Sequence, residues 1–109
     1  MKEIPRNILM NLPEPSDGEE VFEVMEETEA FLIERIVSNN AVSPQQGWYE
    51  QDHDEWVILL QGSSIIQTSE STIELHKGDT LLIKAFEKHK VIYTSSIPHC
   101  VWIAVHQKK

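Results

Sequence analysis

The feature that most constrains the fold is a series of short apolar or alternating runs from residue 31 to residue 106. The runs are rich in Ile, Val, Trp and Tyr, and turn residues separate them. They are FLIERIVS, EWVILLQG, SIIQTS, TIELH, TLLIK, HKVIYT and HCVWIAVH, with turns predicted at residues 69–71, 76–79 and 95–98. No helical segment separates these runs. The sequence therefore predicts an all-β antiparallel sandwich or barrel.

The first thirty residues predict an arm rather than a domain, because three prolines interrupt any long element. Ser16-Asp17-Gly18, followed by two glutamates, indicates the start of a short helix. Val21, Phe22 and Met25 would form its apolar face. We expect an arm with a short helix over residues 1–30 and one barrel domain over residues 31–109, since 109 residues suffice for a single core.

Charge and cysteine content exclude several classes of partner and site. The formal net charge is -9, which argues against binding to nucleic acid or to anionic membranes. No apolar run approaches the roughly 20 residues of a membrane span, and the N-terminus lacks a secretory pattern, so we expect a cytoplasmic protein. The lone Cys100 cannot form an internal disulfide and is expected to be a small buried hydrophobe.

The stretch GWYEQDHDEWVILLQG, residues 47–62, places potential ligands at the mouth of a predicted strand. Its Glu55 and Gly62 have the spacing that ends the first sequence motif of the cupins, and Gly47 opens the stretch. The second cupin motif begins at Gly78, and His89 falls at its histidine position. Residues 31–106 thus resemble the cupin superfamily. They are also similar to small single-domain, RmlC-like cupins with a Trp-Tyr-x-Gln and Glu-Trp pattern.

The resemblance implies a double-stranded β-helix, a jelly-roll barrel that usually holds a metal on three histidines and one glutamate. Here the two histidines of the first motif are replaced, by Tyr49 and Gln51 or, with the longer spacing, by Trp48 and Glu50. Lys84 and Phe86 also replace the Pro and the second Gly of the second motif. By position, Glu55 and His89 alone survive from the metal set.

Tyr49, Gln51, His53 and Glu55 share parity and would line one face of an extended chain. The candidate metal ligands are Gln51, His53, Glu55 and His89, a set suited to Fe, Mn, Ni or Zn. Parity does not decide whether His53 points into the barrel or lies in a turn. Tyr49 and Glu55 are the candidate catalytic residues, because both can transfer protons. A glutamate facing the barrel interior requires a metal, a proton or a hydrogen-bonded partner.

These observations leave three functions open. The first is a metal-dependent enzyme of isomerase, decarboxylase or oxygenase type that acts on a small polar molecule. The second is a metal-free module that binds a small molecule, and the third is a structural protein without a site. The resemblance also implies a homodimer, formed through sheet faces or through exchange of a strand at residues 6–12.

Overall fold

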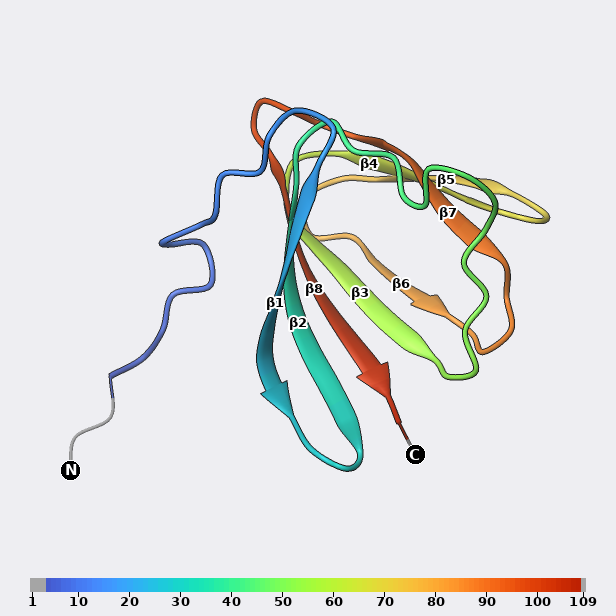
Figure 1. Cartoon of the computed structure of the whole chain (residues 1–109), viewed down its shortest axis with the longest axis horizontal. Coiled ribbons are helices and arrows are strands. Elements are labelled where there is room, and N and C mark those ends of the chain that lie inside the picture. Colours follow the sequence, from blue (N-terminus) through green and yellow to red (C-terminus); the bar gives the residue numbers. More distant parts are fainter. Residues whose placement is uncertain (1–3, 109) are drawn as a thin grey trace.

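The computed structural model describes residues 4–108, which form eight strands and no helix. The strands are β1 (Glu20–Glu27), β2 (Phe31–Ser38), β3 (Glu55–Gln61), β4 (Ser64–Thr68), β5 (Thr72–Leu75), β6 (Thr80–Ile83), β7 (His89–Thr94) and β8 (Cys100–Gln107). They make two antiparallel sheets, ordered β1-β2-β8-β3-β6 and β5-β4-β7 (Figure 1). The all-β jelly-roll prediction is confirmed. Across residues 4–108 there is also no helix of the length and hydrophobicity that crossing a bilayer requires.

The predicted strands form where the side chains alternate between two environments. In β3, Glu55, Val57 and Leu59 are buried while Trp56 is exposed, as the period of two requires. All seven predicted runs are strands within one or two residues of their expected ends. Local alternation was therefore enough to locate these strands.

The short helix predicted near residue 19 is wrong, because residues 20–27 form strand β1. β1 pairs with β2 along its whole length, from Glu20 opposite Ser38 to Glu27 opposite Leu32. Thr28 makes the connecting turn: its hydroxyl accepts hydrogen bonds from the N–H groups of Ala30 and Phe31. Backbone pairing with β2 outweighs the local helix-start signal, so this acidic segment becomes the edge of the larger sheet.

The core lies between the two sheets. Its buried residues come from β3, β4, β5 and β8: Val57, Leu59, Ile66, Leu75, Cys100, Trp102 and Ala104. Gly62 ends β3 with φ 88°, and a Cβ placed there would lie 2.6 Å from the Ser95 hydroxyl. This close approach gives a physical reason for glycine at the motif position.

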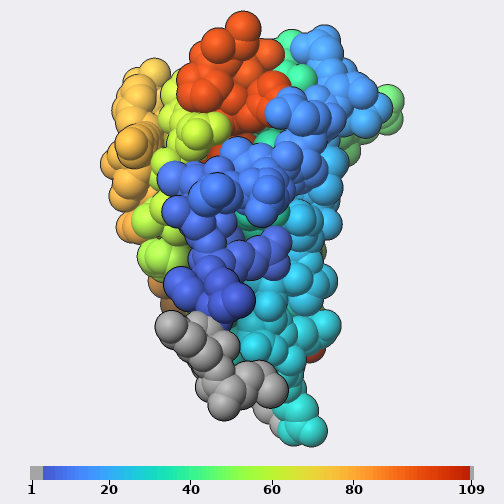
Figure 2. All heavy atoms as spheres, turned by 90° about the vertical axis from the view of Figure 1, so that its left-hand side faces the viewer, coloured from blue at the N-terminus to red at the C-terminus, as the bar shows by residue number. Residues whose placement is uncertain are grey.

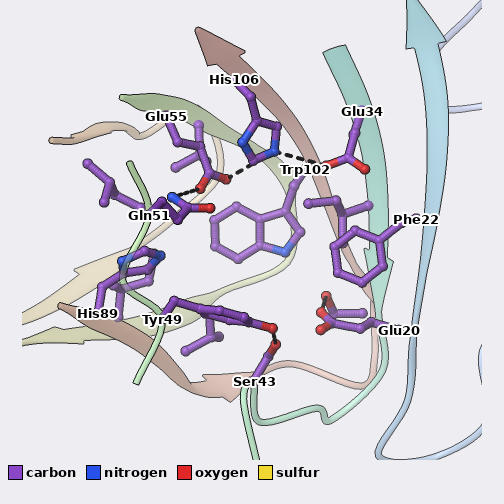
Figure 3. A pocket seen from close by; sticks show the side chains of 16 residues that line it. Glu20, Phe22, Glu34, Ser43, Tyr49, Gln51, Glu55, His89, Trp102 and His106 are labelled. Carbon is purple, nitrogen blue, oxygen red and sulfur yellow. Dashed lines mark hydrogen bonds and ion pairs between the residues drawn. The ribbon is translucent and has the colours of Figure 1, made fainter. Parts of the chain in front are cut away.

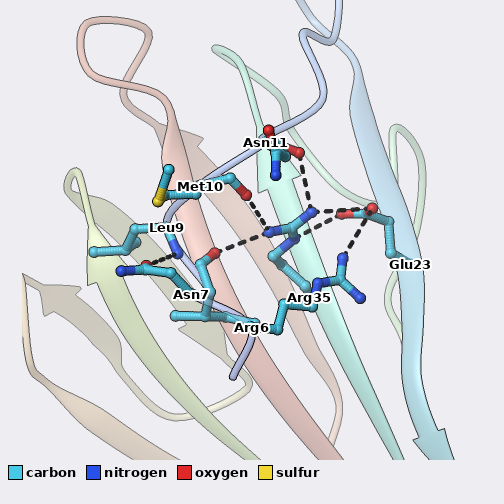
Figure 4. Close-up of polar contacts among 8 residues, drawn as sticks. Arg6, Asn7, Leu9, Met10, Asn11, Glu23 and Arg35 are labelled. Carbon is cyan, nitrogen blue, oxygen red and sulfur yellow. Dashed lines mark hydrogen bonds and ion pairs between the residues drawn. The ribbon is translucent and has the colours of Figure 1, made fainter. Parts of the chain in front are cut away.

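The N-terminal arm lies on the outer face of the larger sheet, as the space-filling view shows (Figure 2). Arg35 of β2 fixes it there. The Arg35 guanidinium donates to the carbonyls of Ile8, Met10 and Asn11 at 2.9–3.3 Å and to both carboxylate oxygens of Glu23 at 2.7 and 3.1 Å (Figure 4). Residues 6–12, the segment considered for strand exchange, thus bind to the chain's own sheet without forming a strand there. The homodimer stays a prediction.

Candidate functional site

A cavity of about 170 Å³ opens between the two sheets (Figure 3). Its apolar wall contains Phe22, Ile36, Val57, Ile66, Ile83, Val91 and Trp102. Its polar wall contains Glu20, Glu34, Ser38, Ser43, Tyr49, Gln51, Glu55, His89 and His106. An engineered cavity of about 150 Å³ holds benzene, so a compact molecule fits in this volume.

The loop between β2 and β3 brings Tyr49 over the cavity. Tyr49 and His89 of β7 exchange both backbone hydrogen bonds, at 2.8 and 3.0 Å, and Ser43 does the same with Val91. The Tyr49 hydroxyl lies 2.5 Å from that of Ser43, and its ring centroid is 5.6 Å from that of His89. The loop is thereby held against the smaller sheet, with Tyr49 as part of the cavity wall.

His89 is buried, and its Nδ1 lies 3.1 Å from the carbonyl oxygen of Glu87. A carbonyl can only accept, so Nδ1 carries the hydrogen of this bond. With the hydrogen on Nδ1, Nε2 is the ring nitrogen that can act as an acceptor. His89 can therefore receive a hydrogen bond from a molecule in the cavity.

Glu55, His106 and Glu34 form an acidic and imidazole cluster across three neighbouring strands. In the register of β3 and β8, Glu55 lies opposite His106; Glu34 of β2 is the diagonal neighbour of His106 on the other side. His106 Nε2 lies 2.9 Å from Glu34 Oε1 and 3.9 Å from Glu55 Oε2. The amide of Gln51 donates to Glu55 Oε1 at 3.0 Å. Glu55 thus has the hydrogen-bonded partner that a buried carboxylate requires.

His53 lies behind this cluster rather than among the residues that line the cavity. Its Nε2 is 3.0 Å from His106 Nδ1, and its Nδ1 is 3.1 Å from the carboxylate of Asp52. The neighbouring Asp54 accepts from the Ala85 N–H at 2.8 Å. That hydrogen bond, with a smaller contribution from Lys84 and against the raising effect of burial, lowers the pKa of Asp54. The loop 51–54 is therefore anchored next to the turn after β6.

The structure brings together four of the five predicted site residues. Tyr49, Gln51, Glu55 and His89 all line the cavity, whereas His53 reaches it only through His106. Sequence reasoning missed His106, and also Glu34 and Glu20, as residues of the site. The parity of β8 contained a signal, because His106 shares a face with the buried Trp102.

The donor set does not fit the metal that cupins usually hold. Gln51 already donates to Glu55, and His53 lies outside the cavity wall, which leaves Glu55 and His89 from the predicted ligands. Residues 4–108 contain no group of three His, Cys, Asp or Glu side chains arranged to hold a metal ion. We therefore derive no chemistry from a metal at this site.

Solved structures match this chain, whereas no protein-family model and no curated protein does. A candidate mannose-6-phosphate isomerase from Ralstonia eutropha JMP134 is 31% identical, with a TM-score of 0.88; the match covers 98% of this chain and 100% of that one. A cupin superfamily protein from Desulfitobacterium hafniense DCB-2 is 14% identical, with a TM-score of 0.80 and coverage of 100% and 95%. KdgF from Halomonas sp. is 15% identical, with a TM-score of 0.71 and coverage of 89% and 86%.

The two more distant likenesses show the fold alone. Together with the whole-length match at 31% identity and the geometry above, they define the class of the protein, a small jelly-roll barrel with a cavity between its sheets. The chain belongs to the cupin superfamily.

Proposed function

We propose that the protein is a metal-free cupin that binds a compact, neutral or positively charged molecule rich in hydrogen-bond donors. The observation that carries this proposal is the composition of the polar wall. It holds the carboxylates of Glu20, Glu34 and Glu55, and the residues that line the cavity include no lysine or arginine. Carboxylates only accept when ionised, so they select hydroxyl and ammonium groups.

The same composition disfavours phosphorylated ligands. Phosphate recognition relies on arginine, lysine or clustered backbone N–H groups, and three carboxylates repel an anion. The relative described as a candidate mannose-6-phosphate isomerase is named for a phosphorylated sugar. For this protein we propose only the sugar part of such a ligand, because the residues that line the cavity include no lysine or arginine. The apolar wall, with Trp102 and Phe22, suits the C–H faces of a sugar or a similar ring.

A matched series of compounds tests this function: mannosamine, mannose and mannose 6-phosphate, with binding followed by calorimetry and thermal shift. We expect the amine and the neutral sugar to bind more tightly than the phosphate ester. Glu55→Gln removes a carboxylate at constant shape and should weaken the amine most. Tightest binding by the phosphate ester, or no binding by any member, would contradict the proposal.

A second candidate function is a metal-free isomerase, favoured by the 31% identical relative and by the surroundings of Glu55. Glu55 is largely buried and has Gln51 and His106 beside it, the arrangement of a carboxylate general base. The carboxylate would take a proton from the carbon next to a carbonyl and return it to the neighbouring carbon, while Tyr49 exchanges a proton with the oxygens. Deuterium incorporation from D₂O into unphosphorylated hydroxycarbonyl compounds tests this activity, and Glu55→Gln should abolish it.

Metal analysis of untagged protein separates these proposals from a metal-dependent enzyme. We expect sub-stoichiometric metal and an unchanged melting temperature after chelation. One equivalent of a transition metal, lost together with several degrees of melting temperature, would favour the metal-dependent alternative instead.

A further inference from the structure

A second, outer hollow adjoins the cavity where β1 begins. It has a volume of about 400 Å³ and lies between residues 18–20 and residues 41–45 of the loop after β2. Glu20, Ser43 and Tyr49 line both the outer hollow and the inner cavity, and Figure 3 shows these three residues along one side of that cavity. The two spaces therefore meet at these three side chains.

Both walls of the outer hollow are held in place by hydrogen bonds within the chain. On one wall, the Asn39 N–H donates to the Glu19 carbonyl at 3.0 Å. On the other, the Thr94 hydroxyl accepts from the Ala41 N–H at 2.6 Å and donates to the Ala41 carbonyl at 2.9 Å. Because both walls are already fixed, a molecule that binds in the outer hollow has to order little of the chain.

The outer hollow offers hydrogen-bond acceptors, one amide and a small apolar surface. Within residues 4–108, no hydrogen bond uses the Glu19 carboxylate or the Gln45 side-chain amide. Glu20 uses one carboxylate oxygen to accept from Ser38 at 3.3 Å, and Val42 adds an apolar side chain that is 47% exposed. The residues that line the hollow include no lysine or arginine. Like the inner cavity, this space therefore suits hydroxyl and ammonium groups rather than anions.

The hydroxyl groups of Tyr49 and Ser43 determine what the junction between the two spaces can bind. They lie 2.5 Å apart and together carry two hydrogens, one of which makes the hydrogen bond between them. The other hydrogen is left for an acceptor in the ligand, such as an ether oxygen. The carboxylates on either side of the junction accept only, when ionised. The matching ligand thus has two parts rich in hydrogen-bond donors, joined by an acceptor.

The inner cavity, at about 170 Å³, has room for one small ring, so a second ring of the same molecule would lie in the outer hollow. We propose that the ligand is a disaccharide, neutral or carrying an amino group, with one ring in each space and its linking oxygen beside Tyr49 and Ser43. This inference rests on the proposed function and deepens it, because the compact molecule proposed above becomes the inner ring of the disaccharide.

Calorimetry with mannose and a panel of mannobioses of different linkage tests the outer hollow. We expect at least one mannobiose to bind about tenfold more tightly than mannose, the gain from one or two additional hydrogen bonds. Binding of mannose with no gain for any mannobiose would overturn the disaccharide proposal and leave the proposed function standing. Absence of binding by every sugar would overturn both.

Two further measurements locate the second ring. In saturation-transfer nuclear magnetic resonance, both rings of the bound mannobiose should receive magnetisation from the protein. Val42→Tyr places a ring in the outer hollow and should reduce the affinity ratio of mannobiose to mannose toward one. Leu82→Tyr is the matched control, since Leu82 is 49% exposed and lines neither space; this variant should keep the ratio of the wild type. Saturation confined to one ring, or an unchanged ratio in folded Val42→Tyr, would overturn the proposal.

Discussion

Glu34 and Arg35 are consecutive residues of β2 that point to opposite faces of the same sheet, and each belongs to a buried charged cluster. On the outer face, all five N–H groups of Arg35 have acceptors at 2.7–3.3 Å, in the arm and in Glu23 (Figure 4). On the inner face, His106 contacts both Glu34 and Glu55, and all three face a cavity of about 170 Å³ (Figure 3). The outer cluster is saturated by the protein itself, whereas the inner one has hydrogen-bonding capacity left for a ligand.

This difference separates structural from functional use of buried charge. A charged group such as Arg35, whose partners all belong to the protein itself, holds segments in place, here the arm against β1 and β2. A charged group that borders a cavity stabilises the fold less, because the chain leaves some of its hydrogen-bonding capacity for a ligand. The comparison therefore predicts large stability effects on the outer face and small ones on the inner face.

Replacement of Arg35 should have the largest effect. Arg35→Met removes every donor of the outer cluster and leaves the arm carbonyls without them, so we expect a loss of about 3 kcal/mol in the free energy of unfolding. Urea denaturation measures this loss. Arg6→Met is the matched control, because Arg6 contacts the same Glu23 at 3.9 Å but is 58% exposed; its loss should stay below about 0.5 kcal/mol. Equal losses would mean that the outer cluster does not anchor the arm.

Acidification should weaken the same cluster. The hydrogen bonds from Arg35 lower the pKa of Glu23 below its ordinary value of 4.5, against the raising effect of burial. A lowered folded-state pKa contributes stability that is fully present above 4.5 and is lost as the pH falls through the folded-state value. When the pH falls from above 4.5 to below the folded-state pKa of Glu23, the free energy of unfolding should therefore decrease more in wild type than in Arg35→Met. Parallel curves of unfolding free energy against pH would contradict the assignment.

Replacement of Glu55 should have a smaller effect on stability and a larger one on binding. Glu55→Leu removes the acceptor of the Gln51 amide but leaves His106 with Glu34 at 2.9 Å, so the loss in the free energy of unfolding should stay near that of one hydrogen bond, about 1 kcal/mol. Binding of the amine that wild type recognises should be lost. Glu74→Leu, at an exposed position of β5, should retain binding. A loss of several kcal/mol in the free energy of unfolding of Glu55→Leu would mean that Glu55, like Arg35, serves mainly to stabilise the fold.

The sequence predicted the strands well because alternation is a local property, read from each run alone. It did not predict β1, since the pairing partner that turns Glu20–Glu27 into a strand lies in another segment. Glu55 and His89 were found through motif spacing. His106 was missed because its place beside Glu55 depends on the register of β8 against β3, which no local pattern contains. Likewise, nothing in the sequence pairs Arg35 with carbonyl groups more than twenty residues earlier.

The smallest change in stability is predicted for Phe86. Phe86 and Asn11 both have positive φ, and they lie in turns beside the inner and the outer cluster, respectively. On the outer side, Asn11 has φ 55°, a conformation that asparagine tolerates. On the inner side, Phe86 has φ 66° at the position of the second motif glycine, is 65% exposed, and donates its N–H to the Gln51 carbonyl at 2.6 Å. Relief of strain should contribute about 1–2 kcal/mol, and glycine's greater freedom in the unfolded chain should offset about 0.5–1 kcal/mol of it.

Phe86→Gly should therefore stabilise the protein by up to about 1.5 kcal/mol, measured by urea denaturation. The matched control is Ala85→Gly, because Ala85 is not among the residues with positive φ. That substitution should cost about 0.5–1 kcal/mol, since only the entropic cost remains. Opposite signs at adjacent positions would show that strain is stored next to Gln51, on the cavity side of the sheet. Losses at both positions would mean that the Phe86 side chain contributes packing that its exposure does not suggest.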